Sequence, residues 1–206
     1  MQAYRRTLSS DTEAITRLQR AFPDSLAQEV KCAAVLLPHP FLNTSIHNIG
    51  IVVVAGESIH IPYRIYIPEP EENVVSELAP IQKTILACIY TRQNDGYIRQ
   101  KYLENILLQH EPWVMPYILQ LMGEYVHEIL ELISQNLDQL DKQACTSFIK
   151  ENPVFVQRLK KRVISYWNCY YRYSYPYFGE YIGFRLLDFL GLWQKNEIKH
   201  LLGYKK

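Results

Sequence analysis

The chain has 206 residues, 48% of them hydrophobic, and its 22 Lys and Arg almost balance its 21 Asp and Glu. A chain of this length can bury a core without disulfides or metals, and its four widely spaced cysteines favour reduced thiols, as in a soluble, cytoplasmic protein. The polar N-terminus predicts no secretory leader, and the prolines and polar residues in the charge-free stretch 32–56 argue against a membrane span.

The first 75 residues predict two helices followed by a β-hairpin. Ser10 to Glu13 is typical of a helix start, and helical spacing of apolar residues continues until Pro23. A second helix is expected from there to about Leu36, and residues 41–48 are expected to form a loop.

A β-hairpin over about residues 49–67 is the clearest strand signal. Gly56-Glu57 favours a tight turn, and the residues after it alternate between two faces. Because proline cannot donate to a strand ladder, Pro62 predicts an edge strand. The expected inward face holds Ile59, Ile61, Tyr63, Ile65 and Ile67. His47, His60, Arg64 and Tyr66 could form a polar pocket, although solvent-facing strand positions explain them more simply.

Everything after the acidic connector 68–72 is predicted to be helical. The expected helices cover about 76–93, 96–109, 112–132, 137–150, 154–172, 178–190 and 194–202. Gly123, inside the longest of them, indicates a close contact with another helix. The expected fold class is α+β, predominantly α, with stacked antiparallel helices and the hairpin packed on them. We expect one domain over 1–206, with the hairpin in 1–75 and the helical region in 76–206.

One short segment resembles a known repeat family. Asp95, Ile98 and Arg99, followed by spaced apolar residues, look like the second helix of a HEAT-type repeat. The resemblance implies that Asp95 caps the helix, that Arg99 pairs with a neighbouring unit, and that helix pairs stack. It covers about 15 residues and has no second copy at a fixed period.

Two Glu-x-x-His elements raise the hypothesis of a metal-dependent enzyme. They are Glu124 with His127 and Glu197 with His200, and Glu104 and Glu180 could complete a di-iron site. Chance explains such pairs almost as well, and Glu124 and His127 lie on the polar side of the predicted helix. No hydrolase, nucleotide-binding or Walker motif occurs, and no cofactor is expected.

Positive charge is concentrated in the last quarter of the chain. Residues 1–152 carry 12 Lys and Arg against 18 Asp and Glu, whereas residues 153–206 carry 10 against 3. On the helix predicted over 154–172, an inward stripe is expected at Phe155, Leu159, Val163, Tyr166 and Tyr170. The candidate partner-binding face holds Arg158, Lys161, Arg162 and Arg172, with Arg185 nearby.

Aromatic residues follow this basic face closely. Such residues among cations can stack nucleic-acid bases, or they can fill the space between helices and leave their hydroxyls wet. The candidates are Tyr171, Tyr173, Tyr175 and Tyr177.

The expected function is that of a non-catalytic interaction module. Its partner would be an acidic protein surface, or a second copy of the chain, at the basic face or at the free edge of the hairpin. The alternative is single-stranded nucleic-acid binding through the same face, and the third hypothesis is the metal-dependent enzyme. No membrane partner is expected.

Overall fold

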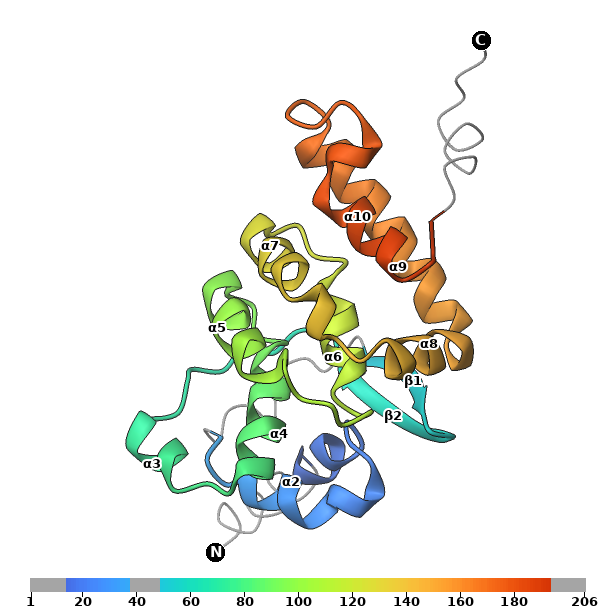
Figure 1. Cartoon of the computed structure of the whole chain (residues 1–206). Coiled ribbons are helices and arrows are strands. Elements are labelled where there is room, and N and C mark those ends of the chain that lie inside the picture. Colours follow the sequence, from blue (N-terminus) through green and yellow to red (C-terminus); the bar gives the residue numbers. More distant parts are fainter. Residues whose placement is uncertain (1–13, 38–48, 194–206) are drawn as a thin grey trace, which may run out of the picture.

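The computed structural model describes residues 14–37 and 49–193, and within them the predicted fold class is confirmed. Helices dominate, and the strands form one antiparallel hairpin (Figure 1). The loop predicted over 41–48 and the helix predicted over 194–202 lie outside the described residues. No helix in the described part is both long and apolar enough to cross a membrane.

The N-terminal part supplies one side of the core. Residues 14–19 are helical, and after a 3₁₀ turn at Asp24–Leu26 helix α2 spans Ala27–Ala34. Phe22, just before Pro23, is buried, and its ring stacks on Tyr117 with centroids 5.5 Å apart. The two predicted helices are therefore present, and their apolar side packs on the helical region.

The hairpin is shorter than predicted. Strands β1 (Ile49–Val54) and β2 (Glu57–Pro62) are joined at Ala55 and Gly56, whose φ angles of 51° and 83° are those of a tight primed turn. Beyond Pro62 the chain leaves the ladder, and Ile65 forms an isolated bridge with Gln93. Tyr63 is 36% exposed, so its predicted inward position is wrong, because the alternation is interrupted there.

The outer edges of the hairpin are engaged by other segments. Asn152 accepts a hydrogen bond from the Val53 N–H and donates one to the Val53 carbonyl, both at 2.7 Å. The Ala55 N–H donates to Glu151, and on the other edge the His60 N–H donates to the Arg20 carbonyl. A partner strand therefore cannot pair at these positions, which corrects the expectation of a free hairpin edge.

The first helical pair follows the acidic connector. A short helix α3 (Glu72–Ser76) precedes α4 (Pro80–Tyr90), so the helix predicted from 76 begins four residues later, because proline suits a first helical position. Helix α5 spans Gly96–Ile106 and lies beside α4 (Figure 1). Asp95 caps it as predicted and accepts a hydrogen bond from the Tyr97 N–H at 2.8 Å.

The long helix predicted from Pro112 is broken in two. Helix α6 covers Met115–Leu121, helix α7 covers His127–Gln135, and residues 122–126 connect them without helical structure. At Gly123 a Cβ atom would lie 2.9 Å from Leu159 Cδ1, which confirms the predicted close contact with another helix. The break turns the next residue, Glu124, into the interior.

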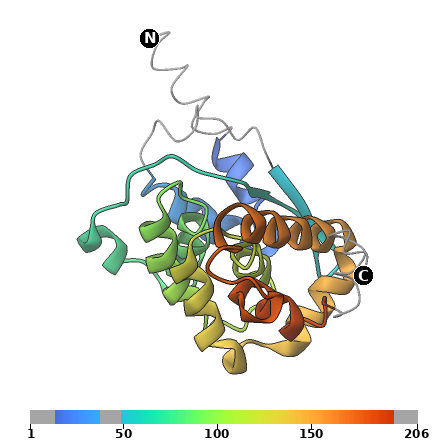
Figure 2. The same cartoon turned by 90° about the horizontal axis from the view of Figure 1, so that it is seen from above.

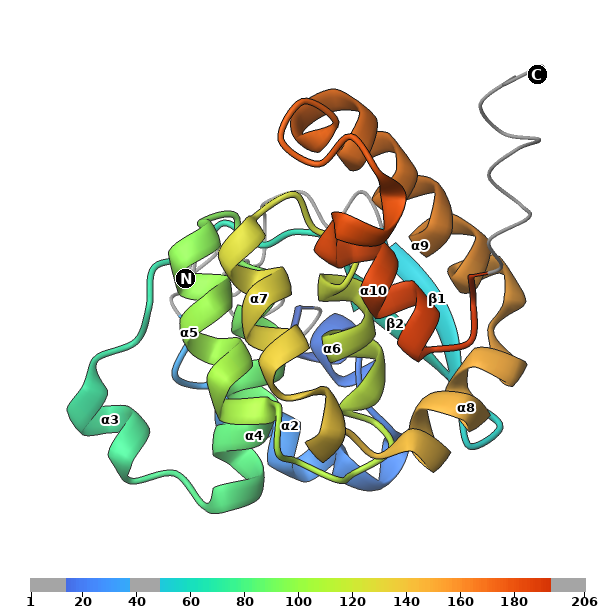
Figure 3. The same ribbon diagram turned by 45° about the horizontal axis from the view of Figure 1, so that its top comes forward.

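The C-terminal helices close the molecule over the hairpin. Helix α8 spans Lys142–Glu151, α9 spans Pro153–Tyr166 and continues into a π-helical turn at Trp167–Tyr171, and α10 spans Ile182–Phe189. Seen from above, α9 crosses the hairpin (Figure 2), and in Figure 3 the hairpin lies between α6 and α9. This arrangement brings β1, β2, α6 and α9 around one cleft.

Candidate functional site

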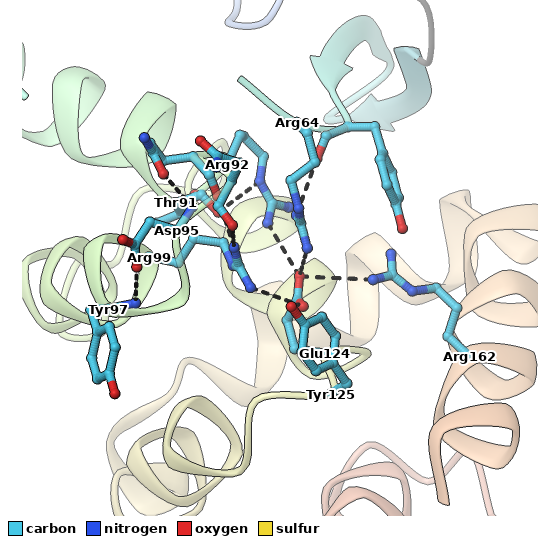
Figure 4. Close-up of polar contacts among 12 residues, drawn as sticks. Arg64, Thr91, Arg92, Asp95, Tyr97, Arg99, Glu124, Tyr125 and Arg162 are labelled. Carbon is cyan, nitrogen blue, oxygen red and sulfur yellow. Dashed lines mark hydrogen bonds and ion pairs between the residues drawn. The ribbon is translucent and has the colours of Figure 1, made fainter. Parts of the chain in front are cut away.

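The Glu124 carboxylate lies at the centre of a group of guanidinium ions (Figure 4). Oε1 is 2.5 Å from Arg64 Nη2 and accepts a hydrogen bond from it, and Oε2 is 3.4 Å from Arg99 Nη2. Arg162 Nη2 and Arg92 Nη2 lie farther away, at 3.8 and 3.9 Å from Oε1. We call these four arginines, 64, 92, 99 and 162, the arginine cluster.

Four separate segments supply the arginine cluster. Arg64 follows β2, Arg92 follows the end of α4, Arg99 lies on α5, and Arg162 lies on α9. The Asp95 cap starts α5 so that Arg99 turns inward, where Nη1 also donates to the carbonyls of residues 93 and 94, each at 2.8 Å. The broken α6–α7 connection places Glu124 opposite all of them. The cluster therefore joins the hairpin, the first helical pair and the C-terminal helices.

Burial sets the electrostatics of the cluster. The side chains of Arg92, Arg99 and Glu124 are fully buried, whereas 15% of the Arg64 side chain and 21% of the Arg162 side chain are exposed. Burial alone would raise the pKa of the Glu124 carboxyl, but Arg64, Arg99 and Arg92 outweigh it and hold that pKa below its usual range. Burial, reinforced by the charge of Arg64, lowers the pKa of Arg92 to about 9. The Glu124 carboxyl is therefore ionised at neutral pH.

One carboxylate does not satisfy four guanidinium groups. Among the described residues, no hydrogen-bond acceptor is found for Arg92 Nη1 and Nη2, Arg99 Nε, or Arg162 Nε and Nη2, although all of these atoms are buried. Buried donors without acceptors carry a desolvation cost, and charged ones carry the largest. The cluster can therefore attract further negative charge.

A cleft of about 590 Å³ lies next to the cluster, between the hairpin, α6 and α9. Its apolar lining comes from Val52, Ile61, Phe155 and Leu159. Its cationic lining comes from Arg158, Lys161 and Arg162. No Asp or Glu is among its lining residues in the described part of the chain. We call it the basic cleft.

Arg162 belongs to both the arginine cluster and the basic cleft. Its guanidinium carbon lies 5.2 Å from the centroid of the Tyr63 ring and 5.7 Å from that of Tyr166, in addition to its contact with Glu124. Arg64 lies at the same 5.2 Å from the Tyr63 ring. These cation–π contacts fix Tyr63 at the boundary between cluster and cleft.

The predicted basic face divides into separate sets. Arg158 and Lys161 line the cleft, are exposed, and form no hydrogen bond or ion pair with any described residue. Arg162 turns toward Glu124 instead. Arg172 lies over the Trp167 ring and donates to Asn168, and Arg185 is exposed on α10, so neither of these belongs to the cleft. The face is therefore not one continuous surface.

The predicted inward stripe of α9 is confirmed only in its first part. Leu159 and Val163 are buried, and Phe155 and Tyr166 are partly buried. Tyr170 is 63% exposed, so its predicted inward position is wrong. The reason is the π-helical turn after Tyr166, which displaces the following side chains from the α-helical register.

The four candidate tyrosines fall into two groups, one packed between helices and one exposed. Tyr171 stacks on the buried Tyr181 at 5.0 Å, and Tyr175 stacks on His127 at 5.8 Å and accepts a hydrogen bond from Trp167 Nε1 on its carbonyl. Both fill space between helices. By contrast, Tyr173 and Tyr177 extend into solvent.

No cluster of metal ligands among the described residues supports the metal hypothesis. No group of three or more His, Cys, Asp or Glu among the described residues lies close enough to hold a metal ion, and Glu197 and His200 lie outside them. Glu124 is buried among cations that would repel a metal ion. Because it is buried and lies between two helices, its predicted position on the polar side of one helix is wrong. His127 lies 3.3 Å from Glu131 and 3.4 Å from the Tyr175 hydroxyl.

The polar pocket considered around the hairpin is not assembled. His47 lies outside the described residues, Tyr66 is 58% exposed, and Arg64 belongs to the arginine cluster. Sequence reasoning missed Arg92, because an arginine at the end of an amphipathic helix usually faces solvent. It singled out Arg99 through the HEAT resemblance, which implies a pairing role for this residue.

No protein family matches this chain, and no curated protein and no solved structure matches it either. The HEAT resemblance therefore still rests only on the residues around Asp95, and the function has to be argued from the cleft and the cluster.

Proposed function

We propose that this protein is a non-catalytic interaction module whose basic cleft binds an acidic segment of a partner protein. The observation that carries the proposal is the cleft lining, which combines cations on α9 with an apolar surface and holds no carboxylate in the described part of the chain. Carboxylates of the partner would meet Arg158 and Lys161, which have no partner of their own among the described residues. Its apolar side chains would pack against Val52, Ile61 and Phe155.

Physical arguments favour a protein segment over a nucleic acid in this cleft. Nucleic-acid surfaces rely on free aromatic faces beside cations, but the Tyr63 ring is already in contact with Arg64 and Arg162. The freely exposed Tyr173 and Tyr177 do not line the cleft. A peptide that alternates acidic and apolar side chains uses both parts of the lining, with the charges raising the association rate and the apolar groups supplying affinity.

A peptide-display selection tests the proposal and does not require the natural partner. Short random peptides would be selected on the wild-type chain and counter-selected on the double variant Arg158→Glu, Lys161→Glu. We expect the enriched peptides to combine Asp or Glu with aliphatic or aromatic residues. A synthetic peptide of the enriched sequence should bind the wild type and lose at least tenfold in affinity for the double variant.

The matched control is Arg172→Glu, Arg185→Glu, which reverses the same number of exposed charges outside the cleft. This control should bind the peptide as the wild type does. If both double variants weaken binding equally, the charge acts non-specifically and the cleft proposal fails. If oligo-dT binds the wild type more tightly than any peptide, with an affinity that falls steeply with salt, the nucleic-acid alternative replaces it.

A further inference from the structure

The outer edge of strand β1 is occupied next to the hairpin turn and free farther along. In an antiparallel pair, hydrogen-bonded and non-hydrogen-bonded residue pairs alternate, and both residues of a non-hydrogen-bonded pair turn their N–H and carbonyl groups outward. Val53 faces outward, because Asn152 binds both of its backbone groups. His60 faces outward on the other strand, because its N–H donates to the Arg20 carbonyl. Ile51 is paired with His60, so its N–H and carbonyl point outward as well.

These two backbone groups of Ile51 have no hydrogen-bond partner within residues 14–37 and 49–193. At Val53 the side-chain amide of Asn152 takes the place that a neighbouring strand would have. The Ile51 side chain is 62% exposed, so this position is open to solvent. An exposed strand edge with unpaired N–H and carbonyl groups is a template on which another chain can pair.

The free part of this edge borders the basic cleft. Gly50 and Val52, the two neighbours of Ile51, line the cleft together with the cations of α9. Apart from its chain neighbours, a Cβ atom at Gly50 would have only one described atom within 4 Å, the Ile61 carbonyl oxygen at 3.8 Å. Figure 3 shows β1 on the side of the hairpin that faces α9. A chain that pairs with Ile51 would therefore lie along the cleft.

We infer that the acidic segment proposed above binds in an extended conformation, as an added strand on the edge of β1 at Ile51. The inference rests on the proposed function and narrows the partner to a segment that forms a β-strand. Because successive side chains of a strand point to opposite faces, one set would enter the basic cleft and the other would lie beside the exposed Ile51 side chain. Backbone hydrogen bonds would supply affinity, and the side chains in the cleft would supply specificity.

Charge argues against a second copy of this chain as the added strand. Pairing two β1 edges would bring Arg158 and Lys161 of one copy toward those of the other, and like charges across an interface are unfavourable. An acidic segment brings carboxylates to a cleft whose described lining has none. Sedimentation velocity should therefore show a monomer. A dimer that Ile51→Pro dissociates would overturn the inference.

Amide hydrogen exchange at Ile51 tests the inference on the unchanged protein. NMR would measure the exchange rates of the β1 amides in the wild type, free and saturated with the synthetic peptide selected on the cleft. We expect the peptide to slow exchange of the Ile51 N–H by at least about tenfold, because this group becomes a donor to the added strand. The Val53 N–H, which already donates to Asn152, should change much less.

The exchange measurement separates this inference from the proposed function. If the peptide binds and loses affinity for Arg158→Glu, Lys161→Glu, but exchange at Ile51 does not slow, the added strand is overturned and the proposed function stands. If no peptide is selected on the cleft, both are overturned.

A proline substitution blocks the edge without removing a bond of the hairpin. Ile51→Pro deletes an N–H that the β1–β2 ladder does not use, and proline is tolerated at such outward positions of edge strands. The matched control Ile51→Val keeps the N–H and the β-branched side chain. We expect Ile51→Pro to lose about tenfold in affinity for the peptide and Ile51→Val to bind as the wild type does. Equal affinities of the two variants would overturn the inference.

Modified peptides give the same test if Ile51→Pro does not fold. In an added strand, the peptide N–H groups that face β1 alternate with those that face away. N-methylation of one peptide residue at a time should therefore weaken binding at alternate positions, with neighbouring positions differing by about tenfold near the residue that pairs with Ile51. Similar losses at neighbouring positions would show that the peptide does not bind as a strand.

Discussion

Arg158 and Arg162 lie one helical turn apart on α9, yet they belong to regions with opposite electrostatic situations. Arg158 is exposed and has no partner among the described residues, whereas Arg162 is partly buried beside Glu124, Tyr63 and Tyr166. The exposed charge of Arg158 stays hydrated, so it carries no desolvation cost and is available to a partner. A charge in the arginine cluster must be compensated inside the protein, so it contributes to the architecture and to what can bind there.

The largest expected effect comes from removing the Glu124 carboxylate, which the arginine cluster surrounds. Glu124→Gln leaves the four guanidinium groups without a carboxylate partner among the described residues, and removing one partner of a buried ion pair costs about 3–5 kcal/mol. We expect urea unfolding to show a loss of this size. The control is Glu131→Gln, an exposed carboxylate near His127, which should change stability by less than about 0.5 kcal/mol. Equal effects of the two substitutions would show that the cluster contributes no special stability.

The same carboxylate should make stability depend on pH in acid. Because the pKa of Glu124 is lower in the folded state than in the unfolded chain, its contribution is complete above the unfolded value of 4.5. It is lost as the pH falls from 4.5 through the folded pKa. The free energy of unfolding of Glu124→Gln, measured by urea unfolding from about pH 6 downward, should therefore fall less steeply with decreasing pH than that of the wild type. If the free energies of unfolding of the variant and the wild type fall in parallel with pH, Glu124 is excluded as a source of the acid sensitivity.

The next effect concerns the edge of strand β1. Asn152 is 5% exposed and makes hydrogen bonds to both the N–H and the carbonyl of Val53. Asn152→Ala leaves these groups unpaired at the hairpin edge, which we expect to cost about 1–3 kcal/mol. Asn168→Ala, which removes an exposed amide in contact with Arg172, is the control. Amide hydrogen exchange should show faster exchange in β1 for Asn152→Ala alone.

The smallest effect on stability is expected at the two exposed cations of the basic cleft. Arg158→Gln and Lys161→Gln should each change the free energy of unfolding by less than about 0.5 kcal/mol, because neither side chain is buried or paired within the described residues. Together they should slow the association of an acidic peptide by roughly tenfold at low salt, with a smaller change at high salt. Urea unfolding measures the first effect and stopped-flow fluorescence the second. A large loss of stability would mean that these cations have a structural role.

Much of the fold could be predicted because its signals are local. The hairpin, the Asp95 cap and the inward position of Leu159 and Val163 follow from alternation, capping chemistry and helical spacing. The break between α6 and α7 could not be predicted, because the apolar spacing continues through it. Gly123 gave the only hint, through its expected close contact.

The candidate site was predicted only in parts. The charge pattern predicts the cations on α9, and the Glu-x-x-His spacing suggests Glu124 as a metal ligand, whereas its partners in the structure are arginines. The prediction for Glu124 is wrong because the long helix on whose polar face it would lie is broken in two. Arg92 was missed, because nothing in its neighbourhood distinguishes a buried arginine from one in solvent.

By itself the sequence determined the hairpin turn, most of the helices, much of their apolar faces, and that positive charge gathers late in the chain, because these depend on neighbours within a few residues. Only the tertiary structure decided that arginines from four separate segments surround Glu124 and that the cations of α9 face different environments. The physical reason is that the cost of a charge depends on its burial and its partners, and both are set by packing between segments far apart in the chain.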